Sequence, residues 1–354
     1  MPSATWMAHG SSSPRPEPHS PRSPDAGLRG EIRQVQGTGC YAARVELGVS
    51  LPTANFPNSS VSHILRIAQA ADRLGYGAVW TYERLLYPIA DVPQPGGPPR
   101  PLPAFYRTAY DPLETLAFVA ASTQYVRLGT SVVDALFHTP VILAKRFATL
   151  DQLSGGRAIA GLGQGWMEQE FATANVPQAR RGRGMTEFIE AMRAVWGPDP
   201  VAYSGRFYRI PESVINPKPA QPGGIPVLFG SMSPAGLQRA AHIADGLNPI
   251  ATSREALAGV VGGFRAAAEA AGRDASRLAI HVRANGIVTP QAMAEDQRPY
   301  LCGSAEQIVA DLVGLKELQL TSVFIGTGMA ASIDEEEQRL EELMGAARGA
   351  GVVG

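Results

Sequence analysis

The sequence predicts a closed (β/α)8 barrel, the TIM-barrel fold, with loop insertions after the second and fourth strands. From Val45 onward, short strand-like runs alternate with segments of helical periodicity, a pattern typical of a parallel sheet built from βα units. Eight units in about 300 residues match the usual size of such a barrel. An open, doubly wound sheet is the alternative, because it is built from the same units.

Each element is predicted from its local pattern. The predicted strands are 46–52, 77–83, 125–133, 157–163, 225–230, 244–250, 278–288 and 321–326. The predicted helices are 61–75, 112–124, 140–153, 183–196, 233–243, 254–271, 304–318 and 334–347. In the first helix, Ile64, Ile67 and Ala71 fall on one stripe and Gly75 ends the pattern.

Two segments interrupt the repeat. Residues 87–112 are rich in Pro and Gly, and they are too long for a simple connection. Residues 164–226 contain a hairpin-like run, 201–210, with Ser204-Gly205 as its predicted turn. Both segments follow strands, at the end of the barrel where catalytic residues lie in this architecture. We therefore expect them to wall or cover the site.

Composition narrows the class of protein. Residues 1–44 are rich in Ser, Pro and Arg, which predicts a disordered tail before one barrel domain, 45–354. A net charge of -1 and a pI near 6.6 argue against nucleic-acid binding.

No run approaches the roughly 20 apolar residues of a membrane span, and no secretory signal is present, so a cytoplasmic location without membrane partners is expected. Cys40 and Cys302 match no disulfide framework or zinc spacing, and no metal is expected.

The segment LSGGRAIAGLGQGWMEQEF, residues 153–171, is the most unusual stretch. Gly161, Gly163 and Gly165 lie within five residues at the predicted end of the fourth strand. Glycines are entropically unfavourable in a strand, so their clustering indicates that something approaches this backbone closely.

Five segments in order resemble the luciferase-like monooxygenase superfamily, most closely its coenzyme F420 (deazaflavin)-dependent oxidoreductases. They are ADRLGYGAVWTYERLLYP, VRLGTSVVDALFHTPVILAKRFATLDQLSGGR, the glycine segment, YRIPESVINPKPAQPGGIPVLFGS and AAHIADGL. The resemblance runs from Val45 to the C-terminus. It implies hydride transfer between F420 and a small organic substrate, and a homodimer paired through barrel helices.

The resemblance also implies a cofactor site. The ring would lie against the third strand, with a non-proline cis peptide near Thr130, Ser131 and Val132. Gly163, Gln164 and Gly165 would approach the ring. Gln164 could substitute for an Asn that family members usually carry where this chain has Met167.

The phosphate of the cofactor would contact Gly230 and Ser231, which precede a predicted helix. A helix N-terminus favours an anion at this place. The alternative is an ordinary N-cap made by Ser231 or Ser233, with Pro234 at the first helical position.

Glu83 and His138 are the catalytic candidates. Tyr82 and Glu83 end the second strand, where relatives often place an Asp or His beside the ring, so Tyr82 would contact the cofactor and Glu83 would act as the acid. The alternative for Glu83 is a salt bridge to Arg84 or another arginine. His138 could instead cap the helix that begins near Pro140.

Two further groups of residues allow two interpretations each. Arg180, Arg181 and Arg183 could bind the oligoglutamate tail of F420 or form a solvated helix start. Trp166 and Phe171 could line the pocket or belong to the core.

Two other functions stay open at this stage. The same fold could bind FMN and act as a monooxygenase. Because Met167 departs from the family pattern, a catalytically silent flavin-binding barrel is the third possibility.

Overall fold

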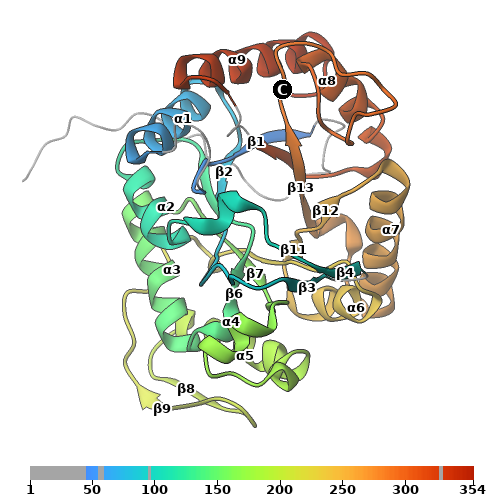
Figure 1. The fold of residues 1–354 in the computed structure, drawn as a ribbon. Helices are drawn as coiled ribbons and strands as arrows, with labels where there is room; N and C mark the ends of the chain where they lie inside the picture. The colour runs from blue at the N-terminus through green and yellow to red at the C-terminus, as the bar shows by residue number, and fades with distance from the viewer. Residues whose placement is uncertain (1–44, 55–59, 95–96, 327–329) are drawn as a thin grey trace, which may run out of the picture. The chain divides into compact units, whose positions relative to one another are not determined.

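The computed structural model describes residues 45–54, 60–94, 97–326 and 330–354, which all belong to one compact unit. The predicted tail, residues 1–44, lies outside the described residues. Figure 1 shows the strands at the centre and the helices around them. No helix in the described part of the chain has the length and apolarity that a membrane crossing requires.

Eight parallel strands form a closed ring. In ring order they are β1 (Glu46–Ser50), β2 (Ala78–Thr81), β5 (Arg127–Thr130), β7 (Ala158–Gly163), β10 (Val227–Phe229), β11 (Gly246–Leu247), β13 (Ala279–Ile287) and β14 (Ser322–Gly326). The pairs β7–β10 and β14–β1 close the ring. The predicted barrel is confirmed, and the open sheet is excluded.

The outer layer holds the eight predicted helices. They are α1 (Val61–Leu74), α2 (Pro112–Ala120), α3 (Pro140–Ser154), α5 (Arg183–Trp196), α6 (Pro234–Ile243), α7 (Arg254–Ala270), α8 (Ala305–Val313) and α9 (Ile333–Gly349). Helix α1 begins at the Ser60 cap and ends at Gly75, whose φ is 81°. The helix predicted over 304–318 is shorter, because α8 stops at Val313 and a 3-10 turn, η5 (Lys316–Leu318), follows.

Large side chains fill the barrel interior. Trp80 and Phe324 stack with ring centroids 4.4 Å apart, and Ile159 and Leu228 pack with them. A Cβ on Gly129 would lie 2.4 Å from the Trp80 ring, so a glycine is required there. The barrel is therefore a packed core, and open space for chemistry lies at the ends of the strands.

The first and last elements meet where the barrel closes. His63 of α1 and Glu336 of α9 form a buried pair, with 2.9 Å between Nε2 and Oε2. The Val45 amide donates to the Val352 carbonyl at 3.1 Å. These contacts add to the β1–β14 ladder.

The insertion after β2 contains a short antiparallel pair, β3 (Val92–Gln94) and β4 (Gly97–Arg100), and a 3-10 turn, η1 (Ala104–Arg107). The chain after β7 forms a short helix, α4 (Glu168–Thr173), and a 3-10 turn, η3 (Gln178–Arg180), before α5. Buried Val92 and Leu102 pack on Met167, so the two insertions contact each other over the barrel.

The predicted hairpin is present as β8 (Val201–Ser204) and β9 (Arg209–Ser213). The predicted Ser204-Gly205 turn is wrong, because Ser204 pairs with Arg209 and Gly205 donates to the Tyr208 carbonyl at 2.9 Å. The longer turn docks on neighbouring elements: the Phe207 amide donates to Glu187 of α5 at 2.8 Å.

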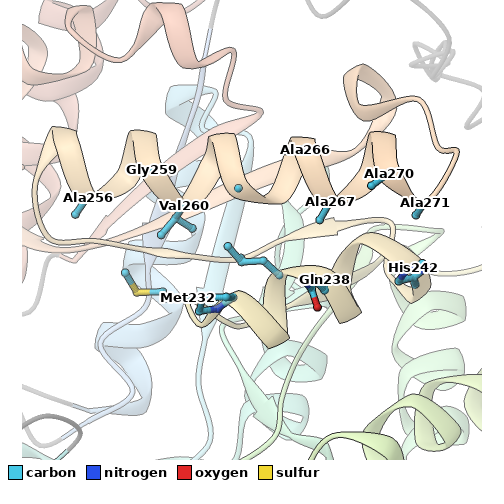
Figure 2. A pocket seen from close by; sticks show the side chains of 13 residues that line it. Met232, Gln238, His242, Ala256, Gly259, Val260, Ala266, Ala267, Ala270 and Ala271 are labelled. Atoms are coloured by element: carbon cyan, nitrogen blue, oxygen red, sulfur yellow. The ribbon is translucent and has the colours of Figure 1, made fainter.

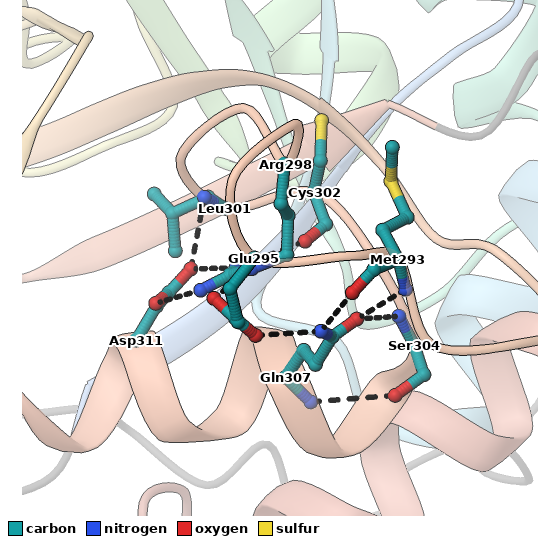
Figure 3. Close-up of polar contacts among 8 residues, drawn as sticks. All are labelled: Met293, Glu295, Arg298, Leu301, Cys302, Ser304, Gln307 and Asp311. Atoms are coloured by element: carbon teal, nitrogen blue, oxygen red, sulfur yellow. Dashed lines mark hydrogen bonds and ion pairs between the residues drawn. The ribbon is translucent and has the colours of Figure 1, made fainter.

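The segment between β13 and α8 is fixed by side chains of α8 and by Arg298. The Arg298 guanidinium makes two bonds to Asp311, of 2.6 and 3.0 Å, and Figure 3 shows how the two side chains face each other. The Gln307 amide bonds both the N–H and the carbonyl of Met293, at 2.9 and 2.8 Å. Polar contacts thus hold this connection in one conformation.

Candidate active site

The third barrel strand is interrupted at the predicted position. Strand β5 ends at Thr130, the Ser131–Val132 peptide bond is cis, and β6 (Val133–Asp134) then pairs with β7. The predicted non-proline cis peptide is therefore confirmed. The Ser131 hydroxyl contacts Asn248 Oδ1 at 2.7 Å, and the Ser131 carbonyl accepts a 2.7 Å bond from Arg283.

The glycines of β7 and β10 make room for this interruption. A Cβ on Gly163 would lie 2.4 Å from Val132, one on Gly230 would lie 2.8 Å from Val132, and one on Gly161 would lie 1.7 Å from the Thr130 carbonyl oxygen. Something does approach this backbone closely, but it is the protein's own third strand. The space expected for a ring on the Cβ side is filled, so any contact of these glycines with a cofactor would use their backbone.

The two catalytic candidates form a pair. Glu83 Oε1 lies 2.7 Å from His138 Nε2, and Glu83 Oε2 accepts the Asp134 amide at 2.8 Å. Both alternatives are wrong in the part of the chain that the structure describes. Glu83 forms its ion pair there with His138 and not with an arginine, and Thr139 rather than His138 is the N-cap of α3. The Glu83 side chain is 5% exposed and that of His138 is 16% exposed, so the imidazole is the more accessible member.

Asp134 lies beside this pair. Its Oδ1 accepts the Gly165 amide at 3.0 Å. Burial and, to a smaller extent, the nearby Glu83 and Glu170 carboxylates raise the pKa of Asp134 to about 7. Sequence reasoning missed this residue, although a single acid within the apolar run VVDALF was a usable signal.

Arg84 connects the two insertions. Its guanidinium pairs with buried Glu170 of α4 at 2.7 Å, and it lies 5.3 Å from the Tyr106 ring centroid and 5.7 Å from that of Trp166. Glu170 also accepts the Leu85 amide at 2.9 Å. Burial raises the pKa of the Glu170 carboxyl, and Arg84 offsets part of that rise.

The insertions carry aromatic and apolar side chains over the barrel. Met167 is buried in a cluster with Val92 and Leu102, so its side chain contributes packing. Trp166 is partly buried in the same cluster. Phe171 is buried against Phe137, with ring centroids 5.0 Å apart.

Tyr82 lies at the mouth of the barrel with a cation. The Arg283 guanidinium of β13 lies 5.2 Å from the centroid of the Tyr82 ring. Burial raises the pKa of Tyr82, and the Arg283 charge opposes that rise. The hydrogen-bond partners of Arg283 are the Ser131 carbonyl and the Asn285 amide oxygen, neither of which carries a charge. Arg283 and Asn248 were missed because both lie inside runs predicted as ordinary strands.

The other predicted cofactor residues have internal partners. The Thr130 hydroxyl contacts both the carbonyl and the amide of Gly161, at 2.7 and 3.0 Å. Gln164 Oε1 accepts the Gly182 amide at 2.7 Å. Gly165 adopts a φ of 72° and lies two residues after the end of β7.

The turn before α6 matches the ordinary N-cap interpretation. Ser233 accepts the Gly236 amide at 3.2 Å, and Pro234 is the first helical residue. The Gly230 amide donates to the Leu162 carbonyl at 2.9 Å. The hydroxyl oxygens of Ser231 and Ser233 are 3.4 Å apart. The predicted phosphate contact of Gly230 and Ser231 stays a prediction.

The three arginines of the predicted cluster make different contacts. Arg180 stacks on Phe207, 4.8 Å from its ring centroid, and Arg181 lies 5.2 Å from that of Phe171. Arg183 begins α5 and lines a hollow together with Arg206. Binding of an oligoglutamate tail by these residues stays a prediction.

A separate apolar groove lies in the outer layer. Figure 2 shows side chains of α6 and α7 facing each other across it, with Met232 at one end and His242 at the other. Its volume is about 700 Å³. None of the predicted site residues lines this groove.

Comparison with known proteins identifies a family. Residues 45–347 match the family described as luciferase-like monooxygenase. A Mycobacterium tuberculosis protein, provisionally named a coenzyme F420-dependent oxidoreductase, is 37% identical over 163 residues, which are 40% of this chain and 43% of the relative. The FMNH(2)-dependent dimethylsulfone monooxygenase of Pseudomonas putida is 30% identical over 166 residues, which are 46% and 44% of the two chains. The chain spans about half the length of the curated relatives that it matches.

Solved structures show the same fold. The coenzyme F420-dependent tetrahydromethanopterin reductase of Methanopyrus kandleri superposes with a TM-score of 0.67. The match covers 85% of this chain and 99% of the other, at 17% sequence identity. At that identity, the similarity supports the barrel architecture and no finer property.

Proposed function

The chain belongs to the luciferase-like monooxygenase family, and from this premise we propose that it is an oxidoreductase that uses coenzyme F420 to transfer a hydride to or from a small organic substrate. The observation that carries the proposal is the 2.7 Å contact between Glu83 and His138 at the ends of the barrel strands. A carboxylate–imidazole pair can give or take the proton that accompanies hydride transfer. The name of the Mycobacterium tuberculosis relative supports the choice of F420.

The residues at the mouth of the barrel fit such a cofactor. The Arg283 guanidinium donates hydrogen bonds to two uncharged oxygens, so no carboxylate in these bonds neutralises its positive charge. Such a charge would stabilise the electron-rich reduced ring. Among the described residues, the buried Gln169 Oε1 has no hydrogen-bond partner and could accept from a ligand. Tyr82, Ser131 and Val132 would hold the ring, with the backbone of 163–165 beside it, and Gly230 and Ser231 would hold the phosphate. When bound, F420 would supply or accept the hydride.

The chain's own residues would manage the proton. Glu83 holds the imidazole through Nε2, and the greater exposure of His138 makes it the group that faces a substrate. Glu83 then orients His138 and stabilises its charged form. The insertions, joined by Arg84 and Glu170, would exclude water from this place.

FMN is the second candidate cofactor, since the Pseudomonas putida relative is named as FMNH(2)-dependent. Equilibrium binding of F420 and FMN to the purified chain, measured side by side, tests the choice. We expect F420 to bind more tightly. Tight binding of FMN without binding of F420 would overturn the proposal in favour of the monooxygenase.

Turnover separates an enzyme from a catalytically silent barrel. With F420 and a panel of alcohols and activated alkenes, Glu83→Gln and His138→Ala should each lower kcat by about 10²–10⁴-fold. Glu114→Gln, which changes a side chain that is 65% exposed, serves as the control. Binding of cofactor without turnover on the whole panel would support the silent alternative.

A further inference from the structure

The Glu83–His138 pair lies in a group of buried charges that cannot all be ionised together. Glu83 is 6% exposed, Asp134 is 7% exposed and Glu170 is fully buried. Against these three carboxyls stand one guanidinium, Arg84, and one imidazole, His138. With every carboxyl ionised, the group carries a net negative charge even when His138 is protonated. Buried like charges of this kind favour the uptake of a proton.

Geometry decides which carboxyl takes that proton. Glu170 is held by Arg84 and by the Leu85 amide, and Glu83 is held by His138 and by the Asp134 amide. Among the described residues, the side chain of Asp134 accepts one hydrogen bond, from the Gly165 amide at 3.0 Å. Its negative charge is therefore the least stabilised of the three, consistent with the raised pKa of Asp134.

The backbone of Asp134 ties this carboxyl to the pair. The Asp134 amide donates to Glu83 Oε2 at 2.8 Å, while Glu83 Oε1 contacts His138 at 2.7 Å. The charged groups that face Asp134 are Glu83 and Arg84 from the segment after β2 and Glu170 from α4. His138, from the segment after η2 (Ala135–Phe137), reaches the same group through Glu83.

We propose that Asp134 is a positioning residue that shares one proton with the Glu83–His138 pair: when His138 releases its proton, Asp134 binds one, and the total charge of the buried group is kept. Loss of the positive imidazole removes the charge that favours ionised Asp134, so the two sites titrate as one unit. Asp134 acts through the pair and contacts no substrate.

This inference deepens the proposed function, because the pair is the acid–base group of that proposal, but its test needs no cofactor or substrate. Long-range 1H–15N spectra of the full chain would follow the His138 ring nitrogens from about pH 5 to pH 9. In the wild-type protein, we expect the His138 signals to show a second step near pH 7, where Asp134 ionises.

Asp134→Asn keeps an oxygen that can accept the Gly165 amide and replaces the other carboxylate oxygen with an uncharged NH2 group. The second step should disappear from the His138 curve in this variant and persist in Asp91→Asn, which changes an exposed acid of the insertion. An unchanged His138 curve in Asp134→Asn would overturn the proposal. If that variant does not fold, the side-chain 13C signal of Asp134 in the wild-type protein decides, because ionisation near pH 4 alone would refute proton sharing.

Discussion

Replacing Arg84 with Met should destabilise the barrel strongly, because it leaves a buried carboxylate without its partner. The Glu170 side chain is 1% exposed and that of Arg84 is 10% exposed, so water does not screen the pair. Removal of one partner of a buried pair costs about 3–5 kcal/mol. The methionine should retain apolar contact with Tyr106 and Trp166. The loss of stability would therefore come mainly from removal of the guanidinium charge.

The loss should depend on pH in a defined direction. Burial raises the pKa of Glu170 even with Arg84 present, so ionised Glu170 is already disfavoured in the folded protein. Without Arg84 that pKa rises further. The variant and the wild type should therefore differ least at low pH, where Glu170 is protonated in both the folded and the unfolded chain. The difference should grow as the pH rises through the folded pKa of the carboxyl.

Urea denaturation, followed by tryptophan fluorescence between about pH 5 and pH 8, measures both effects. Arg66→Met is the matched control, since Arg66 pairs with Asp334 and Glu337 on the surface and is 43% exposed. This control should change stability little. A loss in Arg84→Met as small as in the control, or one independent of pH, would refute the reasoning.

Three further predictions concern the barrel itself. Asp151→Ala should lower the free energy of unfolding by about 3 kcal/mol or more in urea titrations. The fully buried carboxylate accepts amides at the start of β7 and in the segment before β10, and each buried amide left without an acceptor costs roughly 1–3 kcal/mol; a loss below about 1 kcal/mol would contradict it. Gly161→Ala should abolish soluble expression or lower the melting temperature sharply, since its Cβ would meet the Thr130 carbonyl at 1.7 Å; a wild-type melting curve would show that the clash is avoided. Glu336→Ala should cost about 3–5 kcal/mol, measured the same way, by leaving buried His63 unpaired, and a neutral result would mean that the pair does not help to close the barrel.

Periodicity was sufficient to predict the barrel but not its local breaks. The stripe of α1 and the order of strands and helices follow from spacing alone, because every helix must bury one face against the sheet. The shortened α8 and the four-residue turn at 205–208 depend on tertiary contacts, such as the bond from Phe207 to Glu187. Local propensity contains no information about such partners.

The residues of the candidate site were likewise predictable in part. Glu83 and His138 could be selected because Glu83 ends one predicted strand and His138 follows the next, and the strands of a parallel barrel end at one rim. Their contact with each other, and the presence of Asp134 behind them, require the distances between separate strands. Arg283 could not be selected for a related reason. It lies within a predicted strand, and the strand pattern does not reveal which side chains from other strands it contacts.

The pairing of β1 with β14 has a consequence for how the chain is made. Strand β1 is complete at Ser50, yet its partner on one side, Ser322–Gly326, leaves the ribosome more than 270 residues later. Until then, β1 has an open edge that other strands could occupy. During synthesis, this edge of the N-terminal half therefore stays open until β14 has been made, and the ring of strands cannot close before then.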